Sequence, residues 1–298
     1  MLDASPLWPA TLHHLRYDSP DPDRLAAFYA RGLGYGAARG PDGEHLLAGS
    51  GRRLVIGAGE KPMAHAWSAF ALADAAQLAA YRSFLEGRGV PLLASPTPLF
   101  EAGAFAVRDP DGRLALFGLA RPDPAATATG PAAALPGELQ HVVVASARFR
   151  DMMGFYIDAL GFMPSDTVHV DDGAGGLGDV NVCFLRSDER HHSFAVFRAP
   201  ESRADHHAYE TTGWGDLKLW GDHFASLEVP IWWGPGRHGA GNNLFFMVKD
   251  PDGNNIEISA ELEIMAKGRE GKRWAGGGKA INLWGQVWTR DTAPDAAR

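Results

Sequence analysis

Cysteine is almost absent from this sequence: Cys183 is the one thiol in 298 residues. A single thiol cannot form an internal disulfide, which excludes a disulfide-stabilised secreted domain. The sequence also has no apolar run long enough to cross a bilayer, and its first residues lack the basic and apolar segments of a secretory leader. We therefore expect a cytoplasmic protein that does not bind membranes.

The chain also has no concentration of charge of one sign. Lys and Arg total 28, Asp and Glu total 36, and the formal net charge is -8. No basic block is present that would follow a phosphate backbone, so nucleic acid is excluded as an expected partner. Hydrophobic residues make up 45% of the chain, which suffices for one large core or two ordinary ones.

The two halves of the chain repeat one pattern of residues. The matched pairs are 12–35 with 139–162, 67–74 with 206–213, and 108–118 with 249–259. An Ala/Pro/Thr/Gly-rich stretch without a periodic apolar face separates the two copies and predicts a linker. The predicted boundaries are a first domain at 1–120, a linker at 121–136, a second domain at 137–265 and a tail at 266–298.

Each copy has the order strand, helix and further strands, twice over. Helical spacing of apolar residues occurs at 24–33, 75–87, 149–160 and 217–227, and short apolar or alternating runs between them predict strands. This order predicts an α+β fold with two tandem domains, each made of paired βαβββ modules that form a curled, incompletely closed barrel around a cavity. In the tail, 266–279 is expected to be a mobile surface segment, and the apolar stretch 280–288 is expected to dock, either over the pocket or at a subunit contact.

Two histidines and one glutamate lie on three separate predicted strands of the second copy. Two His and one carboxylate can form a facial site that leaves positions open on Fe(II) for a bidentate substrate and dioxygen. We choose His141, His206 and Glu257. Glu257 stands between two isoleucines, where an unpaired carboxylate is costly unless a cation compensates it.

The second histidine ligand is a choice between two neighbours. Adjacent residues of a strand point to opposite faces, so only one of His206 and His207 can reach the metal. The repeat aligns Tyr209 with Phe70, and if both pack under a helix, His206 faces the cavity. His207 stays open as the alternative, because a bulge of one residue exchanges the two faces.

Five motifs of the second half, in this order and spacing, resemble a known family. They are LQHVVV, RHHSFAVF, DHHAYE, GPGRHGAGNN and DPDGNNIEIS. They resemble the type I extradiol catechol dioxygenases of the vicinal-oxygen-chelate (glyoxalase/bleomycin-resistance/dioxygenase) superfamily, and as two repeated domains the resemblance covers nearly the whole chain. It implies an Fe(II) enzyme, with Mn(II) as the alternative metal, that cleaves a small aromatic diol with dioxygen and assembles as a homo-oligomer. The first copy has Trp67 and Leu116 where the second has His206 and Glu257, so we expect it to be metal-free.

The resemblance also implies roles for residues around the triad. His192 matches the acid/base histidine, whereas its neighbour His191 is expected to point away. His238, in a glycine-rich loop, matches the histidine that hydrogen-bonds the substrate oxygen. Met247 stands where the family usually has a tyrosine, and a thioether cannot supply the hydroxyl. Either the chain handles a differently shaped ring, or another donor, such as Tyr209 or a water, takes the place of the tyrosine.

Trp233 is expected to form a wall of the aromatic pocket, together with Met247 and Tyr209, because flat rings stack on flat rings. Two other functions remain open. One is a non-redox metal enzyme of the same superfamily, such as an isomerase, epimerase or thiol transferase. The other is a metal-free protein that binds an aromatic compound, which the loss of the tyrosine at Met247 favours mildly.

Overall fold

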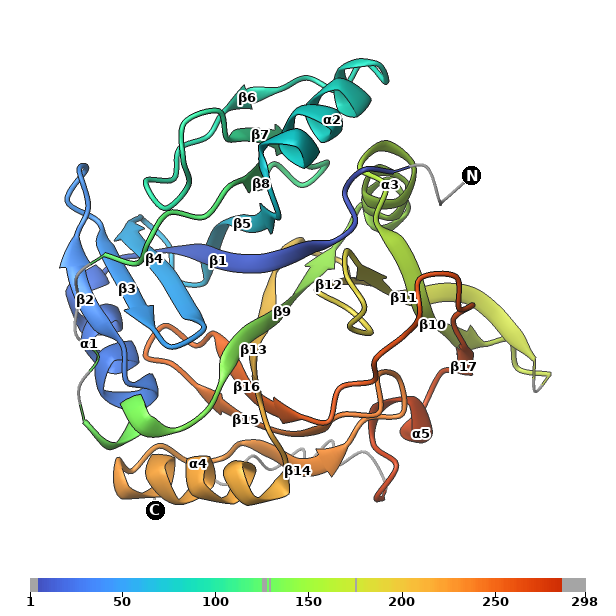
Figure 1. The fold of residues 1–298 in the computed structure, drawn as a ribbon. Coiled ribbons are helices and arrows are strands. Elements are labelled where there is room, and N and C mark those ends of the chain that lie inside the picture. Colours follow the sequence, from blue (N-terminus) through green and yellow to red (C-terminus); the bar gives the residue numbers. More distant parts are fainter. Residues whose placement is uncertain (1–4, 125–127, 129, 175, 286–298) are drawn as a thin grey trace.

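The structure is a computed structural model, and it describes residues 5–124, 128, 130–174 and 176–285. In these residues the strands form two mixed sheets, one in each half of the chain (Figure 1). No helix in the described ranges is both long and apolar enough to cross a membrane.

The first half contains two consecutive modules of the order strand, helix and three strands. They comprise β1 (Ala10–Ser19), α1 (Pro22–Leu33), β2 (Gly36–Arg39), β3 (His45–Gly49) and β4 (Arg52–Ala58), then β5 (Ala64–Leu72), α2 (Ala75–Glu86), β6 (Leu93–Ala94), β7 (Phe105–Arg108) and β8 (Leu114–Gly118). The sheet order is β2-β3-β4-β1-β5-β8-β7-β6. In each module the first and last strands pair in parallel, and the two modules join through the antiparallel pair β1 and β5.

The second half repeats this arrangement. It comprises β9 (Glu138–Ser146), α3 (Phe149–Gly154) with the π-helical turn η3 (Phe155–Ala159), β10 (Met163–Asp171), β11 (Leu177–Arg186) and β12 (Phe194–Arg198), then β13 (Arg203–Thr211), α4 (Trp214–Ser226), β14 (Trp233–Arg237), β15 (Leu244–Lys249) and β16 (Asn255–Ala260). With β17 (Arg273–Ala275) of the tail at one edge, the order is β14-β15-β16-β13-β9-β12-β11-β10-β17. The parallel pairs are β9 with β12 and β13 with β16, and β9 joins β13 in antiparallel fashion. The predicted α+β fold of four βαβββ modules is therefore confirmed.

The ends of α1 show why the chain turns where it does. The Asp21 carboxylate caps the helix by accepting a hydrogen bond from the backbone N–H of Arg24, 3.0 Å away. Gly34 ends the helix at φ 66°, and a Cβ atom there would lie 2.3 Å from the backbone of Ala133. Only glycine fits both requirements, so α1 stops where the segment between the two halves crosses it.

The two halves share one hydrophobic core. A single cluster of buried side chains contains residues from both, including Tyr29 and Tyr35 of the first half and Tyr209 of the second. The Tyr35 and Tyr209 hydroxyls lie 2.9 Å apart, and the Tyr29 hydroxyl donates to Asp250 at 2.9 Å. Part of the predicted linker also joins this core, since the 3₁₀ helix η2 (Pro131–Ala134) buries Ala132.

The tail differs from the expectation of a mobile surface segment. β17 (Arg273–Ala275) pairs in parallel with β10, and the short helix α5 (Gly278–Ile281) follows it. Figure 1 shows this red segment beside β10 and β11. The prediction of a mobile segment is wrong for residues 273–279, because backbone pairing and the helix that follows it hold this part of the tail without any apolar periodicity. Of the expected docking stretch, residues 286–288 lie outside the described residues.

Candidate metal centre

The register of three neighbouring strands brings the predicted metal ligands to one face of the second sheet. On β13, Ala208 lies opposite His141 of β9 on one side and opposite Glu257 of β16 on the other. Residues paired in this way point to the same face of a sheet, and so do residues two apart on one strand. His206 therefore faces the same side as the other two, and the methyl group of Ala208 leaves room between them.

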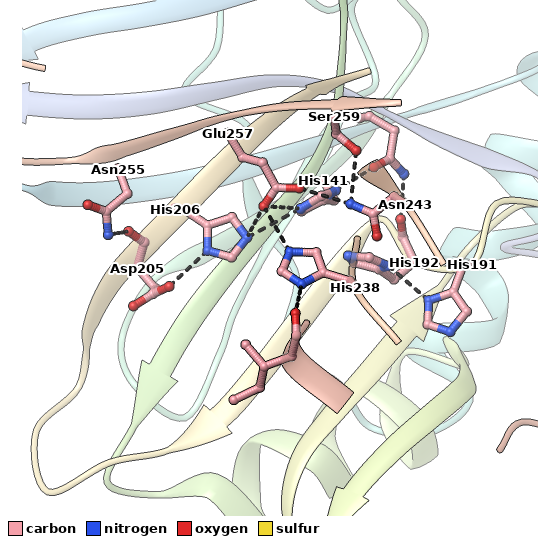
Figure 2. A network of polar contacts seen from close by, with 12 residues as sticks. His141, His191, His192, Asp205, His206, His238, Asn243, Asn255, Glu257 and Ser259 are labelled. Atoms are coloured by element: carbon pink, nitrogen blue, oxygen red, sulfur yellow. Dashed lines mark hydrogen bonds and ion pairs between the residues drawn. The ribbon is translucent and has the colours of Figure 1, made fainter. Parts of the chain in front are cut away.

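The side chains of these three residues converge (Figure 2). One ligand atom from each lies within 4.8 Å of the others. The Nε2 atoms of His141 and His206 are 3.3 Å apart, and Oε2 of Glu257 lies 3.4 Å from His206 Nε2 and 3.9 Å from His141 Nε2. Among the described residues this is the one group of three His, Cys, Asp or Glu side chains so arranged.

His207 lies on the opposite face. Its ring contacts the first half of the chain, with Nδ1 3.1 Å from the hydroxyl of Tyr17 and Nε2 3.3 Å from that of Tyr29. The register runs without a shift from His206 to Ala208, so no bulge exchanges the two faces. Of the two adjacent histidines, the structure therefore places His206 at the centre.

Each of the two histidines is oriented by the residue immediately before it. The Nδ1 atom of His141 lies 2.5 Å from Oε1 of Gln140, and Nδ1 of His206 lies 2.8 Å from Oδ2 of Asp205. Because these oxygens only accept, Nδ1 carries the hydrogen and the lone pair of Nε2 points to the centre. Sequence reasoning missed Gln140 and Asp205, although a polar residue directly before each histidine was the available signal.

Glu257 has one satisfied and one unsatisfied oxygen. The side chain is 1% exposed. Its Oε1 accepts a hydrogen bond from Asn243 at 3.0 Å, whereas the buried Oε2 has no hydrogen-bond partner among the described residues. An unpaired buried carboxylate oxygen is costly, and a cation between it and the two imidazole nitrogens removes that cost. The donor set therefore fits a divalent metal ion.

The surroundings favour the protonation states in which Glu257 and His141 can bind a metal, an ionised carboxylate and a neutral imidazole. Burial raises the pKa of Glu257, but the surrounding imidazoles of His238, His141 and His206 outweigh it and lower the pKa to about 2. Burial lowers the pKa of His141 to about 3, so its imidazole is neutral at pH 7. For His206, burial lowers the pKa, but Asp205 and Glu257 outweigh it and raise the value.

His192 lies beside the triad and His191 behind it. The His192 ring is centred 4.2 Å from that of His141 and lines the cavity. Burial and the neighbouring histidines, His141 first, hold its pKa well below the usual value, so the ring is neutral. His191 turns away from the cavity, with Nε2 3.3 Å from the Asp166 carboxylate and Nδ1 3.0 Å from Nδ1 of His192.

His238 faces the centre from the loop after β14. Its Nε2 lies 3.9 Å from Glu257 Oε2, and its ring stacks on Phe245 with centroids 3.8 Å apart. Nδ1 lies 2.6 Å from the carbonyl oxygen of Ile281 in the tail (Figure 2). Since a carbonyl only accepts, Nδ1 carries the hydrogen and Nε2 is the atom turned to the centre. The tail thus fixes the orientation of a cavity histidine.

The centre opens into a cavity of about 400 Å³. Trp233 and Met247 line it, because Trp233 is paired with Met247 and Met247 with Glu257 across β14, β15 and β16. Ala280 and Ile281 of the tail also contribute to its wall. The tail was expected to dock either over the pocket or at a subunit contact. Its described residues Ala280 and Ile281 lie at the pocket.

Tyr209 does not line the cavity, and this expectation was wrong. Its side chain is fully buried on the other face of β13, in the core shared with the first half. The alternation that turns His206 inward turns Tyr209 outward, because three positions separate them on one strand. Tyr209 therefore cannot supply the hydroxyl that Met247 lacks.

Paired βαβββ modules in a curled sheet, here holding a His-His-Glu cluster, are the arrangement of the vicinal-oxygen-chelate fold. Residues 138–258, in the second half of the chain, match the profile of the Glyoxalase/Bleomycin resistance protein/Dioxygenase superfamily.

Two curated relatives each match a little less than half of the chain. Metapyrocatechase 2 of Cupriavidus necator is 28% identical over 137 residues, which are 45% of this chain and 40% of that protein. The 3-methylcatechol 2,3-dioxygenase of Pseudomonas putida is 32% identical over 137 residues, 45% of this chain and 46% of that protein. The match thus spans less than half the length of either relative.

Solved structures match over nearly the whole chain. BphC, described as a halotolerant catechol dioxygenase, superposes with a TM-score of 0.79 at 20% identity and covers 97% of each chain. The Mn(II)-bound glyoxalase from Novosphingobium aromaticivorans superposes with a TM-score of 0.71 at 25% identity, over 93% of this chain and 91% of that one. At 20% identity, the similarity to BphC is evidence for the fold alone.

Proposed function

We propose that this chain is an Fe(II)-dependent extradiol dioxygenase. In the proposed reaction a catechol and one molecule of dioxygen give a single ring-opened product. The ring carbon–carbon bond next to the diol breaks, and both oxygen atoms enter the product. When bound, Fe(II) supplies chelation of the two diol oxygens and electron transfer from the diol to dioxygen.

The observation that carries this proposal is the unsatisfied Oε2 of Glu257 facing two oriented imidazole nitrogens at the wall of a cavity. Three ligands on one side leave the opposite side of a metal ion open to other ligands. That open side faces the cavity of about 400 Å³, which is large enough for a substituted aromatic ring. The relatives named as catechol dioxygenases support the same chemistry.

His192 and His238 divide the handling of protons in this proposal. A neutral His192 beside the triad accepts a proton from a substrate hydroxyl and later returns it to the opened product. His238 holds a substrate oxygen through Nε2, because its Nδ1 is engaged by the tail carbonyl of Ile281. Trp233 and Met247 position the flat ring by contact and exclude water from it.

The test is anaerobic reconstitution of the protein with Fe(II), followed by oxygen uptake and visible absorbance recorded together over a panel of catechols. Oxygen consumed one-for-one with a new yellow chromophore is the expected result. Tight iron and catechol binding without oxygen uptake contradicts the proposal. In that case Met247→Tyr is the first variant to test for a gain of oxygen uptake.

A second candidate is a non-redox enzyme that uses Mn(II). The Mn(II)-bound glyoxalase supports it, because it matches over most of both chains and shares 25% of its residues with this chain. The absence of a hydroxyl at Met247 supports it as well. Oxygen uptake separates the two candidates, since an isomerase or thiol transferase consumes none. A metal-free binding protein is separated by measuring whether the protein retains iron through gel filtration.

A further inference from the structure

Resting on the proposed function, we infer that the substrate is an uncharged catechol that carries an apolar substituent, and that the cavity rejects catechols with a carboxylate substituent. The inference concerns the part of the cavity away from the triad. It follows from the side chains of β10, β11 and β12 and from the distribution of charge along the wall.

An apolar band extends sideways from the metal ligands. In the second sheet, β12, β11 and β10 follow β9 in that order, so each step leads one strand further from His141. Val168, Val182 and Phe197 are direct cross-strand partners on these three strands and all line the cavity. Strands are spaced about 4.8 Å apart, so the band provides an apolar wall for a substituent of several carbon atoms.

Further apolar side chains continue the band on other sides. Phe184 lies on the same strand face as Val182, two residues further on, and also lines the cavity. The tail closes part of the wall with small or apolar residues, Gly277, Ala280 and Ile281. A hydrocarbon substituent therefore finds apolar contacts on β10, β11, β12 and the tail.

The charged side chains of the wall are acidic. Among the described residues that line the cavity, Asp205 and Glu257 are carboxylates and none is a lysine or an arginine. A substrate carboxylate that enters such a wall loses its hydration without a lysine or arginine side chain to pair with. Asp205 is already paired on both oxygens. Its Oδ2 faces His206, and its Oδ1 accepts a hydrogen bond from Nη1 of Arg203 at 3.0 Å.

Arg237 precedes the cavity-lining His238 and Arg273 contacts the cavity-lining His169, and both arginines have protein partners. Arg237 donates to the carbonyl of Asn242 and forms an ion pair with Glu261. Arg273 directs its Nε to the ring of His169, 3.4 Å away, and His169 is itself held by Gly178 through Nδ1 at 2.9 Å. Neither arginine is among the residues that line the cavity.

The test compares substrates that differ in charge at one position. 4-Ethylcatechol and 3,4-dihydroxyphenylacetate carry two-carbon substituents at the same ring carbon, and 3-ethylcatechol and 2,3-dihydroxyphenylacetate form the isomeric pair. We expect kcat/KM, followed by oxygen uptake, to favour the ethyl compound by about 100-fold or more in at least one pair, with no pair reversed. Equal values in both pairs, or a preference for either carboxylate, overturn the inference.

A pair of variants assigns the preference to the band. Val182→Lys places an ammonium group in the apolar wall, and it should shrink the ratio of ethyl to carboxymethyl substrate by about 10-fold or more. Val182→Met, the control, adds length without charge and should keep the ratio. An unchanged ratio in Val182→Lys, with iron content and fold intact, contradicts the assignment.

Anaerobic binding of the same four compounds to the iron-loaded protein separates this inference from the proposed function. If no compound supports oxygen uptake, the dioxygenase proposal fails. Tighter binding of the ethyl compounds then still supports an uncharged ligand, and equal or tighter binding of the carboxylates overturns it.

Discussion

In the first sheet Phe100 and Leu99 cover the concave face, whereas in the second the same face surrounds a cavity of about 400 Å³. The two faces share their register. Ala69 lies opposite His14 and Leu116, as Ala208 lies opposite His141 and Glu257. One scaffold therefore presents the same positions twice, and side chains alone decide what each position does.

His14 shows the consequence most clearly. Its Nε2 lies 2.7 Å from the hydroxyl of Thr97 and its ring packs 5.0 Å from that of Phe100. The matched Nε2 of His141 instead faces the unsatisfied oxygen of Glu257. A histidine at this position is therefore compatible with either a packed core or a metal ligand. The residues at the positions of Trp67 and Leu116 make the difference.

The strongest way to break the contrast is to remove the carboxylate. Glu257→Ala should abolish iron retention and oxygen uptake, because two imidazoles remain of a site that needs three protein ligands. Iron content after gel filtration measures the effect. Unchanged iron content would remove Glu257 from the ligand set.

The matched control is Leu116→Ala in the first sheet. Leu116 is fully buried, so the variant should cost about 2–5 kcal/mol of unfolding free energy while iron per folded protein stays the same. Denaturant melts and metal analysis together check this. Loss of iron would mean that the first sheet contributes to the metal centre.

Removing His192, the proposed proton carrier, should have the next largest effect. His192→Ala should retain iron and substrate binding but slow turnover by about 100-fold or more, because a group that transfers protons is lost. Single-turnover absorbance with preformed iron–catechol complex isolates this step. Full activity would show that His192 has no role in the reaction.

The two halves also differ at the residue before the second histidine position. The second half has Asp205 there, which contacts Nδ1 of His206, and the first half has Ala66. Asp205→Asn keeps an oxygen for Nδ1 of His206 but removes the charge that supports it. We expect iron affinity to fall by about 10- to 100-fold. Competition with a chelator of known affinity measures the change, and an unaltered affinity would show that His206 needs no such support.

The smallest expected effect concerns Glu210, whose matched position in the first half is Ala71. Burial raises the pKa of Glu210 to about 7, and its Oε2 has no hydrogen-bond partner within the described ranges. The folded state therefore holds a proton that the unfolded chain releases near pH 4.5, so stability falls as pH rises from there to about 7.

Glu210→Gln should remove this loss. We expect the variant to be more stable than the natural chain by about 1–2 kcal/mol at pH 8 and nearly equal to it at pH 4.5. Urea melts of the metal-free proteins at the two pH values give the comparison. An equal difference at both pH values would assign the effect to packing instead of to protonation.

The repeat made much of this site predictable from the sequence. Aligning the halves placed His141, His206 and Glu257 on three strands, and strand alternation favoured His206 over His207. The same alternation should have excluded Tyr209 from the pocket, because it stands three positions beyond His206 on one strand. The expectation that Tyr209 lines the pocket rested only on the hydroxyl that is missing at Met247.

Other features could not be predicted from patterns of residues. The tail pairs with β10 through backbone groups, and the indole of Trp274 donates to Asp166 at 2.6 Å, contacts that leave no periodic signal. The filling of the first concave face by Leu99 and Phe100 depends on the path of a loop between β6 and β7. Such long-range packing is set by tertiary structure, not by local propensity.

The central claim is that the second sheet holds a metal centre that adds dioxygen to a catechol ring, and isotope labelling tests it most directly. The iron-loaded protein and its Glu257→Ala variant are given an alkyl catechol under ¹⁸O₂, and the product is trapped at once and analysed by mass spectrometry. We predict a ring-opened product that carries both heavy oxygen atoms with the natural chain, and none with the variant. An intact ring, a product without label, or equal product from both proteins would contradict the account.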